Sequence, residues 1–326
     1  MTAPDGVAYT PGELDRDATF YVAGHRGLVG SAIVRRLEKA GFTNIVGKTS
    51  AELDLKNRDA VFDYLGDTKP KYLVLAAAKV GGILANSTYP VDFLSDNLRI
   101  QTNVLDAALA HNVERVAFLG SSCIYPKLAD QPIREDALLT GHLEPTNDAY
   151  AIAKIAGILN IQAVRRQYGL PWISAMPTNL YGPNDNFSPT GSHVLPALIR
   201  RYDDAARSGA TSVTNWGTGT PRREFLHADD MADAILHLLE HYDGPEHVNV
   251  GTGTDVTIRE IAETIAGVTG FEGETEWDTT KPDGTPQKLL DVSKLAEAGW
   301  TAKITLEEGM ERTIAWYRDH IGDVRE

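Results

Sequence analysis

A tyrosine and a lysine at helical spacing are the residues of this chain with the clearest capacity for chemistry. Tyr150 and Lys154 are four positions apart, so a helix would place them on one face. An ammonium beside a phenol favours the phenolate and lowers the tyrosine pKa, so that the phenol can exchange a proton with a carbonyl or alcohol near neutral pH. The upstream hydroxyl of Ser121 could hold the same oxygen. These three residues predict hydride transfer to or from a sugar carbonyl.

The same spacing also fits an ordinary helix with a half-buried tyrosine and a solvated lysine. Cys123, two residues after Ser121, is not needed for hydride transfer and indicates a further step. A buried free cysteine is more often only a small apolar side chain, so both interpretations of Cys123 stay open at this point.

Three glycines near the start of the chain favour the enzymatic interpretation. Gly24, Gly27 and Gly30 follow an apolar run at residues 19–23 and precede an amphipathic stretch at residues 28–40. A strand, a glycine-rich turn and a helix N-terminus together bind a dinucleotide pyrophosphate, although a plain tight turn can have the same pattern. The residues predicted to line this loop are Gly24, His25, Arg26, Gly27, Leu28, Val29 and Gly30.

The expected second strand, at residues 44–48, bears on the choice of cofactor. NAD enzymes usually carry an acidic residue at its end for the ribose 2′-hydroxyl, but no acid occurs here before Glu52. Arg26 and Lys48 could instead pair with a 2′-phosphate, which favours NADP(H). The alternative is that both cations are merely solvated.

Strand-like and helical patterns alternate through the first half of the chain. This alternation predicts an α/β fold: a Rossmann doubly wound parallel sheet with a smaller C-terminal α/β substrate-binding domain. Further strands are expected at residues 72–77, 116–119, 172–175, 248–250 and 274–277, and further helices at 92–111 and 149–168. The expected domains are a flexible extension at residues 1–17, an NADP-binding domain at 18–179 and a substrate domain at 180–326, some of which may rejoin the sheet.

Composition excludes several classes of partner. The chain has 326 residues, 42% hydrophobic and 23% charged, with a net charge of −14, which argues against nucleic acid and anionic membranes as partners. One cysteine fits a reducing, cytoplasmic location, and the acidic start lacks the pattern of a signal peptide.

Nine sequence runs resemble those of the extended short-chain dehydrogenase/reductase family. Within it, the resemblance is to the subfamily that converts GDP-4-keto-6-deoxy-D-mannose to GDP-L-fucose with NADPH. It spans the chain from Phe20 to about Tyr317. The runs lie at residues 23–32, 76–83, 119–127, 144–147, 150–157, 176–183, 192–193, 223–227 and 281–286.

The resemblance implies one site that epimerises C3 and C5 and then reduces C4. Ser121, Tyr150 and Lys154 match the reductive residues, and Cys123 and His193 match the epimerisation pair, with His193 otherwise explicable as a helix-entry residue. The segment expected to line the nicotinamide is Pro177, Thr178, Asn179 and Leu180, with His193 beside it. The positions expected to hold the GDP-sugar are Arg201, Trp216, Arg223, Asp283 and Lys288.

Some features stay open. Related enzymes can carry Arg where Lys48 and Ser50 stand, which leaves the preference for NADP(H) over NAD(H) in question. The surface cations could form ordinary salt bridges and Trp216 could belong to the core. The cluster of His227, Asp229 and Asp230 is best explained as a helix start, so no metal is expected.

The family resemblance also implies a homodimer formed through the helices at 92–111 and 149–168. The alternatives for function are another nucleotide-sugar epimerase or reductase of the same fold, and a non-enzymatic NADP-binding scaffold.

Overall fold

Six parallel strands form the central sheet of the computed structural model, which describes residues 11–188, 191–281 and 283–323. Their spatial order is β10-β5-β4-β3-β1-β2, so the order reverses beside β1, where β3 lies on one side and β2 on the other. Ligands of open α/β sheets bind outside the carboxyl ends of the strands at such a reversal. The strands are β1 (Phe20–Ala23), β2 (Ile45–Val46), β3 (Tyr72–Leu75), β4 (Arg115–Leu119), β5 (Ile173–Pro177) and β10 (Val248–Val250).

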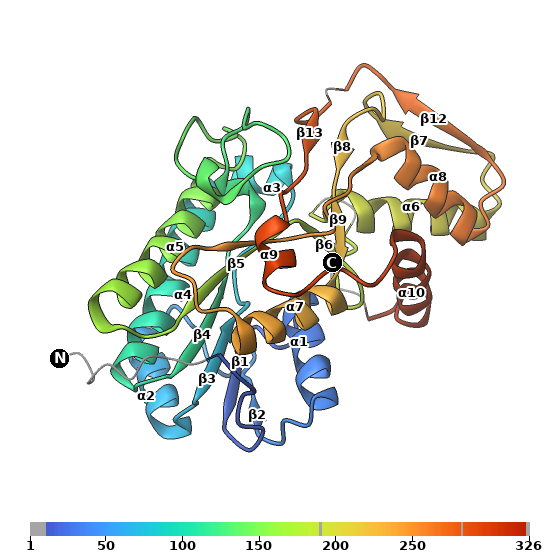
Figure 1. Cartoon of the computed structure of the whole chain (residues 1–326). Helices are drawn as coiled ribbons and strands as arrows, with labels where there is room; N and C mark the ends of the chain where they lie inside the picture. Colours follow the sequence, from blue (N-terminus) through green and yellow to red (C-terminus); the bar gives the residue numbers. More distant parts are fainter. Residues whose placement is uncertain (1–10, 189–190, 282, 324–326) are drawn as a thin grey trace.

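Helices cover both faces of this sheet (Figure 1). Along β1, Phe20 and Val22 belong to one apolar cluster, and Tyr21 and Ala23 belong to the other, because successive strand residues point to opposite faces. The first face is covered by α1 (Leu28–Lys39) and α7 (Ala228–His241), and the second by α2 (Arg58–Thr68), α4 (Pro90–Ala110) and α5 (Asp148–Tyr168). The doubly wound parallel fold is therefore confirmed.

A third apolar cluster holds together a smaller part of the molecule beside the carboxyl edge of the sheet (Figure 1). Its helices are α6 (Val194–Ser208), α8 (Ile258–Thr269) and α10 (Leu306–Asp319). Its strands are β6 (Asn179–Tyr181), β7 (Ser212–Trp216), β8 (Arg222–Arg223), β9 (Phe225–His227), β11 (Val256–Thr257), β12 (Glu274–Asp278) and β13 (Gln287–Lys288). The short elements are α3 (Ile83–Thr88), α9 (Ser293–Glu297), η1 (Ser122–Ile124) and η2 (Glu135–Ala137).

The expected elements are present with small shifts at their ends. The helix expected at 92–111 begins at Pro90, since proline suits the first turn of a helix. Sequence analysis named no element for α2, although Asn57 caps it by accepting a hydrogen bond from the Ala60 amide at 3.2 Å. Strand β10 pairs with β5 across a long sequence separation.

The expected N-terminal extension is only partly described, since residues 1–10 lie outside the described residues. Residues 11–17 differ from a loosely packed tail. Leu14 is buried in the first apolar cluster, and Arg16 forms a 2.6 Å ion pair with Glu240 of α7. The ion pair attaches this stretch to α7, and the burial of Leu14 attaches it to the first apolar cluster. The acidic composition did not indicate either contact. In the described part of the chain, no helix has the length and apolar content needed to cross a bilayer.

Candidate active site

The glycine-rich turn lies between β1 and α1, at the reversal of strand order. Gly24 has φ +86°, and a Cβ there would lie 2.8 Å from the Ala77 main-chain nitrogen, so only glycine fits. A Cβ on Gly30 would collide with the Gly24 carbonyl oxygen. Gly27 is the N-cap of α1 and supplies no side-chain cap. First-turn amides without a side-chain cap are suited to a pyrophosphate, so this turn fits a dinucleotide.

The expected ribose end of this turn carries positive charge. Arg26 is exposed on the turn itself. Lys48 lies 3.5 Å from Glu52, in a salt bridge whose side chains are both well exposed. Hydrogen bonds from Thr49 hold the pKa of Glu52 at about 2, so this carboxylate is ionised and partly balances Lys48. Exposed pairs of this kind contribute little energy, so the pair leaves Lys48 able to contact a phosphate.

Ser121 and Cys123 are presented by a short turn after β4. The Gly120 amide donates to the Ala175 carbonyl oxygen at 2.9 Å, which extends the pairing of β4 with β5. Ser121 then caps η1, its hydroxyl oxygen accepting a hydrogen bond from the Cys123 amide at 3.4 Å. Both side chains are therefore held at the carboxyl edge of the sheet.

Tyr150 and Lys154 share a face of α5 directed at this turn. The Lys154 ammonium donates to the Leu119 carbonyl oxygen at 2.8 Å and lies 5.7 Å from the centre of the Tyr150 ring. Burial lowers the pKa of Lys154 to about 8. The pKa of Tyr150 is raised, first by burial and then by Cys123, whereas sequence analysis expected Lys154 to lower it. Loss of hydration disfavours the phenolate, so Tyr150 is a protonated phenol near neutral pH.

Cys123 is a buried thiol with cations around it. Burial raises its pKa, while Lys288, the Ser121 hydroxyl and Lys154 all act to lower it. Lys288 is half-buried, and its pKa is lowered first by loss of hydration and then by Arg223. The structure thus places Ser121, Cys123, Lys154 and Lys288 in one electrostatic cluster. Sequence analysis had placed Lys288 only at the nucleotide end.

His193 lies at the start of α6 as its N-cap, on the side of the smaller part of the molecule. His193 as a whole is exposed to solvent. Protein packed around its imidazole ring nevertheless removes part of the ring's hydration, which lowers the pKa of His193 and favours the neutral imidazole. Within the described residues, no hydrogen bond or ion pair connects His193 to the cluster, and its pairing with Cys123 stays a prediction.

The segment expected to line the nicotinamide joins β5 to β6. The Thr178 amide donates to the Val250 carbonyl oxygen at 3.0 Å, which places this segment beside β10. The Thr178 hydroxyl and the Asn179 amide group donate to the Glu224 carbonyl oxygen at 3.2 and 2.8 Å. Pro177 and Leu180 flank these two anchored residues.

The expected GDP-sugar residues lie on the smaller part of the molecule. Trp216, at the end of β7, is 71% exposed, which does not fit the alternative that it belongs to the core, and Lys281 lies 5.7 Å from its ring centre. Arg201 donates to the Asn215 side-chain oxygen at 2.9 Å. Asp283 accepts hydrogen bonds from the amide and hydroxyl of Thr218 at 2.9 and 2.7 Å.

Arg223 and Lys288 are partners in the parallel pairing of β8 with β13. They therefore project from adjacent strands at one level, and two cations at one level suit a diphosphate. Arg222 beside them pairs instead with Asp255 at 2.8 Å, as expected for a surface salt bridge. His227 and Asp229 occupy the start of α7, as sequence analysis expected: the His227 ring accepts a hydrogen bond from the Asp229 amide.

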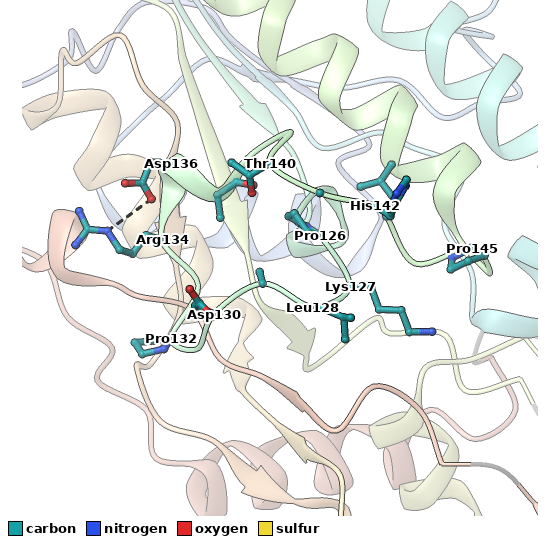
Figure 2. A pocket seen from close by; sticks show the side chains of 14 residues that line it. Pro126, Lys127, Leu128, Asp130, Pro132, Arg134, Asp136, Thr140, His142 and Pro145 are labelled. Carbon is teal, nitrogen blue, oxygen red and sulfur yellow. Dashed lines mark hydrogen bonds and ion pairs between the residues drawn. The ribbon is translucent and has the colours of Figure 1, made fainter.

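A pocket of about 560 Å³ opens in the loop that follows the turn of Ser121 and Cys123 (Figure 2). The loop spans residues 126–145, and Lys127 pairs with Glu144 across it at 2.9 Å. The charge of Glu144 also acts on Lys288, so this loop borders the candidate site. The sequence does not indicate this pocket, because the loop that lines it has no periodic pattern.

The glycine turn and the Ser121, Tyr150 and Lys154 set define an extended short-chain dehydrogenase/reductase. Residues 20–251 match the family described as NAD dependent epimerase/dehydratase. The chain is 61% identical to GDP-L-fucose synthase 1 of Arabidopsis thaliana over 94% of this chain and 95% of that one. It is 52% identical to GDP-L-fucose synthase of Escherichia coli over 92% and 96%. The chain therefore belongs to the NAD dependent epimerase/dehydratase family and, within it, to the group of GDP-L-fucose synthases.

The fold has a close counterpart among solved structures. A GDP-L-fucose synthetase from Naegleria fowleri, bound to NADP, superposes with a TM-score of 0.89 at 28% identity, covering 99% of this chain and 100% of that one.

Proposed function

We propose that the protein is an NADP(H)-dependent enzyme that converts GDP-4-keto-6-deoxy-D-mannose to GDP-L-fucose. It epimerises C3 and C5 and then reduces C4 in one site. The observation that carries this proposal is Cys123, a thiol held beside Ser121 and within the influence of Lys288 and Lys154. A reductase alone needs no such thiol, whereas an epimerase needs a base close to the carbonyl that activates its substrate.

Epimerisation begins with removal of a proton next to the C4 carbonyl. That carbonyl acidifies the hydrogens on C3 and C5, because the resulting carbanion delocalises into an enolate. Cys123 acts as the base and His193 returns a proton on the opposite face. The nearby ammonium groups oppose the effect of burial and favour the thiolate. The hydroxyls of Ser121 and Tyr150 stabilise the enolate oxygen by hydrogen bonding.

Reduction uses the same oxygen. The glycine turn would hold NADPH, which when bound would supply the hydride for C4. Tyr150, which burial keeps as a phenol, donates its proton to the C4 oxygen. Lys154 carries the compensating positive charge, and its bond to the Leu119 carbonyl oxygen holds it 5.7 Å from the centre of the Tyr150 ring.

The cofactor proposal rests on charge at the ribose end. Arg26 and Lys48 would contact the 2′-phosphate, and Lys48→Glu should raise the KM for NADPH at least tenfold while leaving that for NADH nearly unchanged. Equal effects on both cofactors would remove Lys48 from 2′-phosphate binding.

For the substrate, Arg223 and Lys288 would bind the diphosphate and the exposed ring of Trp216 would contact the base or a sugar. Arg201 and Asp283 would complete this end of the site. The proposed division is an NADP-binding domain at residues 18–179 and a substrate domain at residues 180–326, from which β10 joins the central sheet.

A homodimer formed through α4 and α5 is part of the proposal. Ile152 and Leu159, on one side of α5, are 46% and 42% exposed, and burying them against a second copy would be favourable. Light scattering that gave a monomer mass at every concentration would contradict this arrangement. A reducing cytoplasmic location would keep the thiol of Cys123 free.

The central test is NADPH oxidation by purified protein with GDP-4-keto-6-deoxymannose, compared with UDP- and dTDP-linked 4-keto sugars, with the product identified by NMR. Turnover of the GDP-sugar to GDP-L-fucose is expected. Reduction without inversion at C3 and C5, or preference for another nucleotide, would instead support a different sugar reductase. Absence of turnover with all three sugars would support the scaffold alternative.

A further inference from the structure

Glu224 is a fully buried acid between β8 and β9 to which the catalytic scheme gives no part. Its carboxylate accepts hydrogen bonds from the amides of Thr252 and Gly253 at 2.6 and 2.7 Å, and from the amide of Leu290 at 3.0 Å. A carboxylate that accepts from three backbone amides fixes the backbone of both segments. A Cβ on Gly251 would collide with this carboxylate, so the neighbouring turn is shaped around it.

The main-chain carbonyl of Glu224 connects to a third segment. It accepts the hydrogen bonds from Thr178 and Asn179, the two central residues of the expected nicotinamide lining. Leu290, on the carboxylate side, follows the expected diphosphate ligand Lys288 by two residues, and the other diphosphate ligand, Arg223, precedes Glu224 directly. One residue therefore contacts both the cofactor side and the substrate side of the site.

We propose that Glu224 is a positioning residue that sets the placement of the GDP-sugar relative to the nicotinamide, so that hydride transfer depends on it more than epimerisation does. The proposal rests on the function proposed above. The reason for the difference between the steps is that Cys123 is held by the turn after β4. Among the described residues, no hydrogen bond of Glu224 reaches that turn. Losing the carboxylate frees Leu290 and the 252–253 turn while leaving the thiol in place.

The chain offers a matched control. Asp230 is also buried and also accepts two backbone amide hydrogen bonds, from Lys303 and Ile304 at 2.8 Å each, but it does so at the start of α7. Glu224→Gln and Asp230→Asn both replace a buried carboxylate by an amide that can no longer accept from every donor. Glu224→Asp keeps the negative charge but has a side chain one methylene shorter, so its carboxylate cannot reach all of the amide donors. This variant replaces Glu224→Gln in the experiment if the glutamine variant does not fold.

The experiment compares two rates in each folded variant. One is deuterium wash-in from solvent at C3 and C5 of the GDP-sugar, and the other is single-turnover NADPH oxidation. For Glu224→Gln we expect hydride transfer to fall at least tenfold with wash-in within about threefold of the parent, and for Asp230→Asn both rates to remain near the parent values. Equal loss of both steps in Glu224→Gln, similar losses in Asp230→Asn, or unchanged hydride transfer would overturn the inference.

Failure of the proposed function would look different from failure of this inference. The unsubstituted protein would then show no wash-in and no NADPH oxidation with the GDP-sugar. In that case the readout is the affinity for GDP with and without saturating NADP⁺. In Glu224→Gln the affinity for GDP should no longer depend on whether NADP⁺ is bound. In Asp230→Asn that dependence should remain. A dependence that survives in Glu224→Gln, or none in the unsubstituted protein, would overturn the positioning role.

Discussion

The ammonium of Lys154 donates a hydrogen bond to the main-chain carbonyl oxygen of Leu119, at 2.8 Å. Leu119 is the last residue of β4, and Ser121 lies two residues later, in the turn proposed to be catalytic. The bond therefore fixes α5 to the end of the strand that presents the serine. It also explains how a buried lysine can keep its charge, since a carbonyl oxygen replaces part of its hydration.

A pH dependence of reduction follows from this buried ammonium. The pKa of Lys154 is lowered to about 8, so its proton leaves as pH rises through that value, whereas an exposed lysine keeps its proton to about pH 10.4. The rate of NADPH oxidation by the already epimerised keto-sugar should be flat below about pH 7 and decline up to tenfold per pH unit above pH 8. Lys154→Arg should move this decline upward, since a guanidinium stays charged. If the rate of NADPH oxidation by Lys154→Arg still declined above pH 8, a group other than Lys154 would be responsible for the decline.

The same shift affects stability with a defined sign. Because the folded-state pKa is the lower one, the unfolded chain binds more protons between the two values, so this group makes the free energy of unfolding rise with pH there. Below about pH 8 the buried charge lowers stability. Lys154→Met should therefore flatten this part of the pH dependence measured by urea unfolding.

Tyr150→Phe should separate epimerisation from reduction. Without the phenol no proton reaches the C4 oxygen, and NADPH oxidation should fall by about 10²- to 10⁴-fold. Deuterium wash-in at C3 and C5 should continue, because Cys123 and Ser121 remain. Tyr125→Phe is a suitable control, since that hydroxyl donates to the Asn249 side chain inside the protein. Product formation at the parent rate in Tyr150→Phe would exclude the phenol as the acid.

Cys123→Ser should have the opposite effect. A serine hydroxyl does not ionise near neutral pH, so wash-in at C3 and C5 should fall at least about 100-fold. Reduction of an already epimerised keto-sugar should remain within about fivefold of the parent rate, because Tyr150 and Lys154 are unchanged. Ser122→Ala alters the neighbouring buried residue of the same turn and tests for general disturbance. If reduction fell as far as wash-in, the proposed division between thiol and phenol would be wrong.

Local sequence patterns predicted the helices and strands of this fold well. They predicted the chemical environment of the candidate site residues less completely. The strand, glycine turn and helix from Phe20 to Lys39 are encoded within one short segment, so the sequence pattern is sufficient there. The pKa of Tyr150 was predicted in the wrong direction, because burial depends on how α5 packs on the sheet. Glu224 forms hydrogen bonds with residues that are 45 and 66 positions away in the sequence. A local periodic pattern cannot reveal contacts at such sequence separations. Glu224 follows two arginines and precedes Phe225 and Leu226, and this mixed run gave no sign that its side chain is buried.

Gly30→Ala should weaken cofactor binding strongly and disturb the fold less. The added Cβ would collide with the Gly24 carbonyl oxygen, so the turn must widen. Its amide N–H groups would then no longer point at the pyrophosphate. We expect NADPH affinity, measured by fluorescence titration, to fall at least about 30-fold from lost charge-assisted hydrogen bonds. Gly267→Ala is the matched control: it lies inside α8, and no atom of the described residues lies within 4 Å of the new Cβ. It should raise stability by about 0.5–1 kcal/mol without changing affinity. If Gly30→Ala binds NADPH like the parent, the cofactor is held elsewhere than at the turn between β1 and α1.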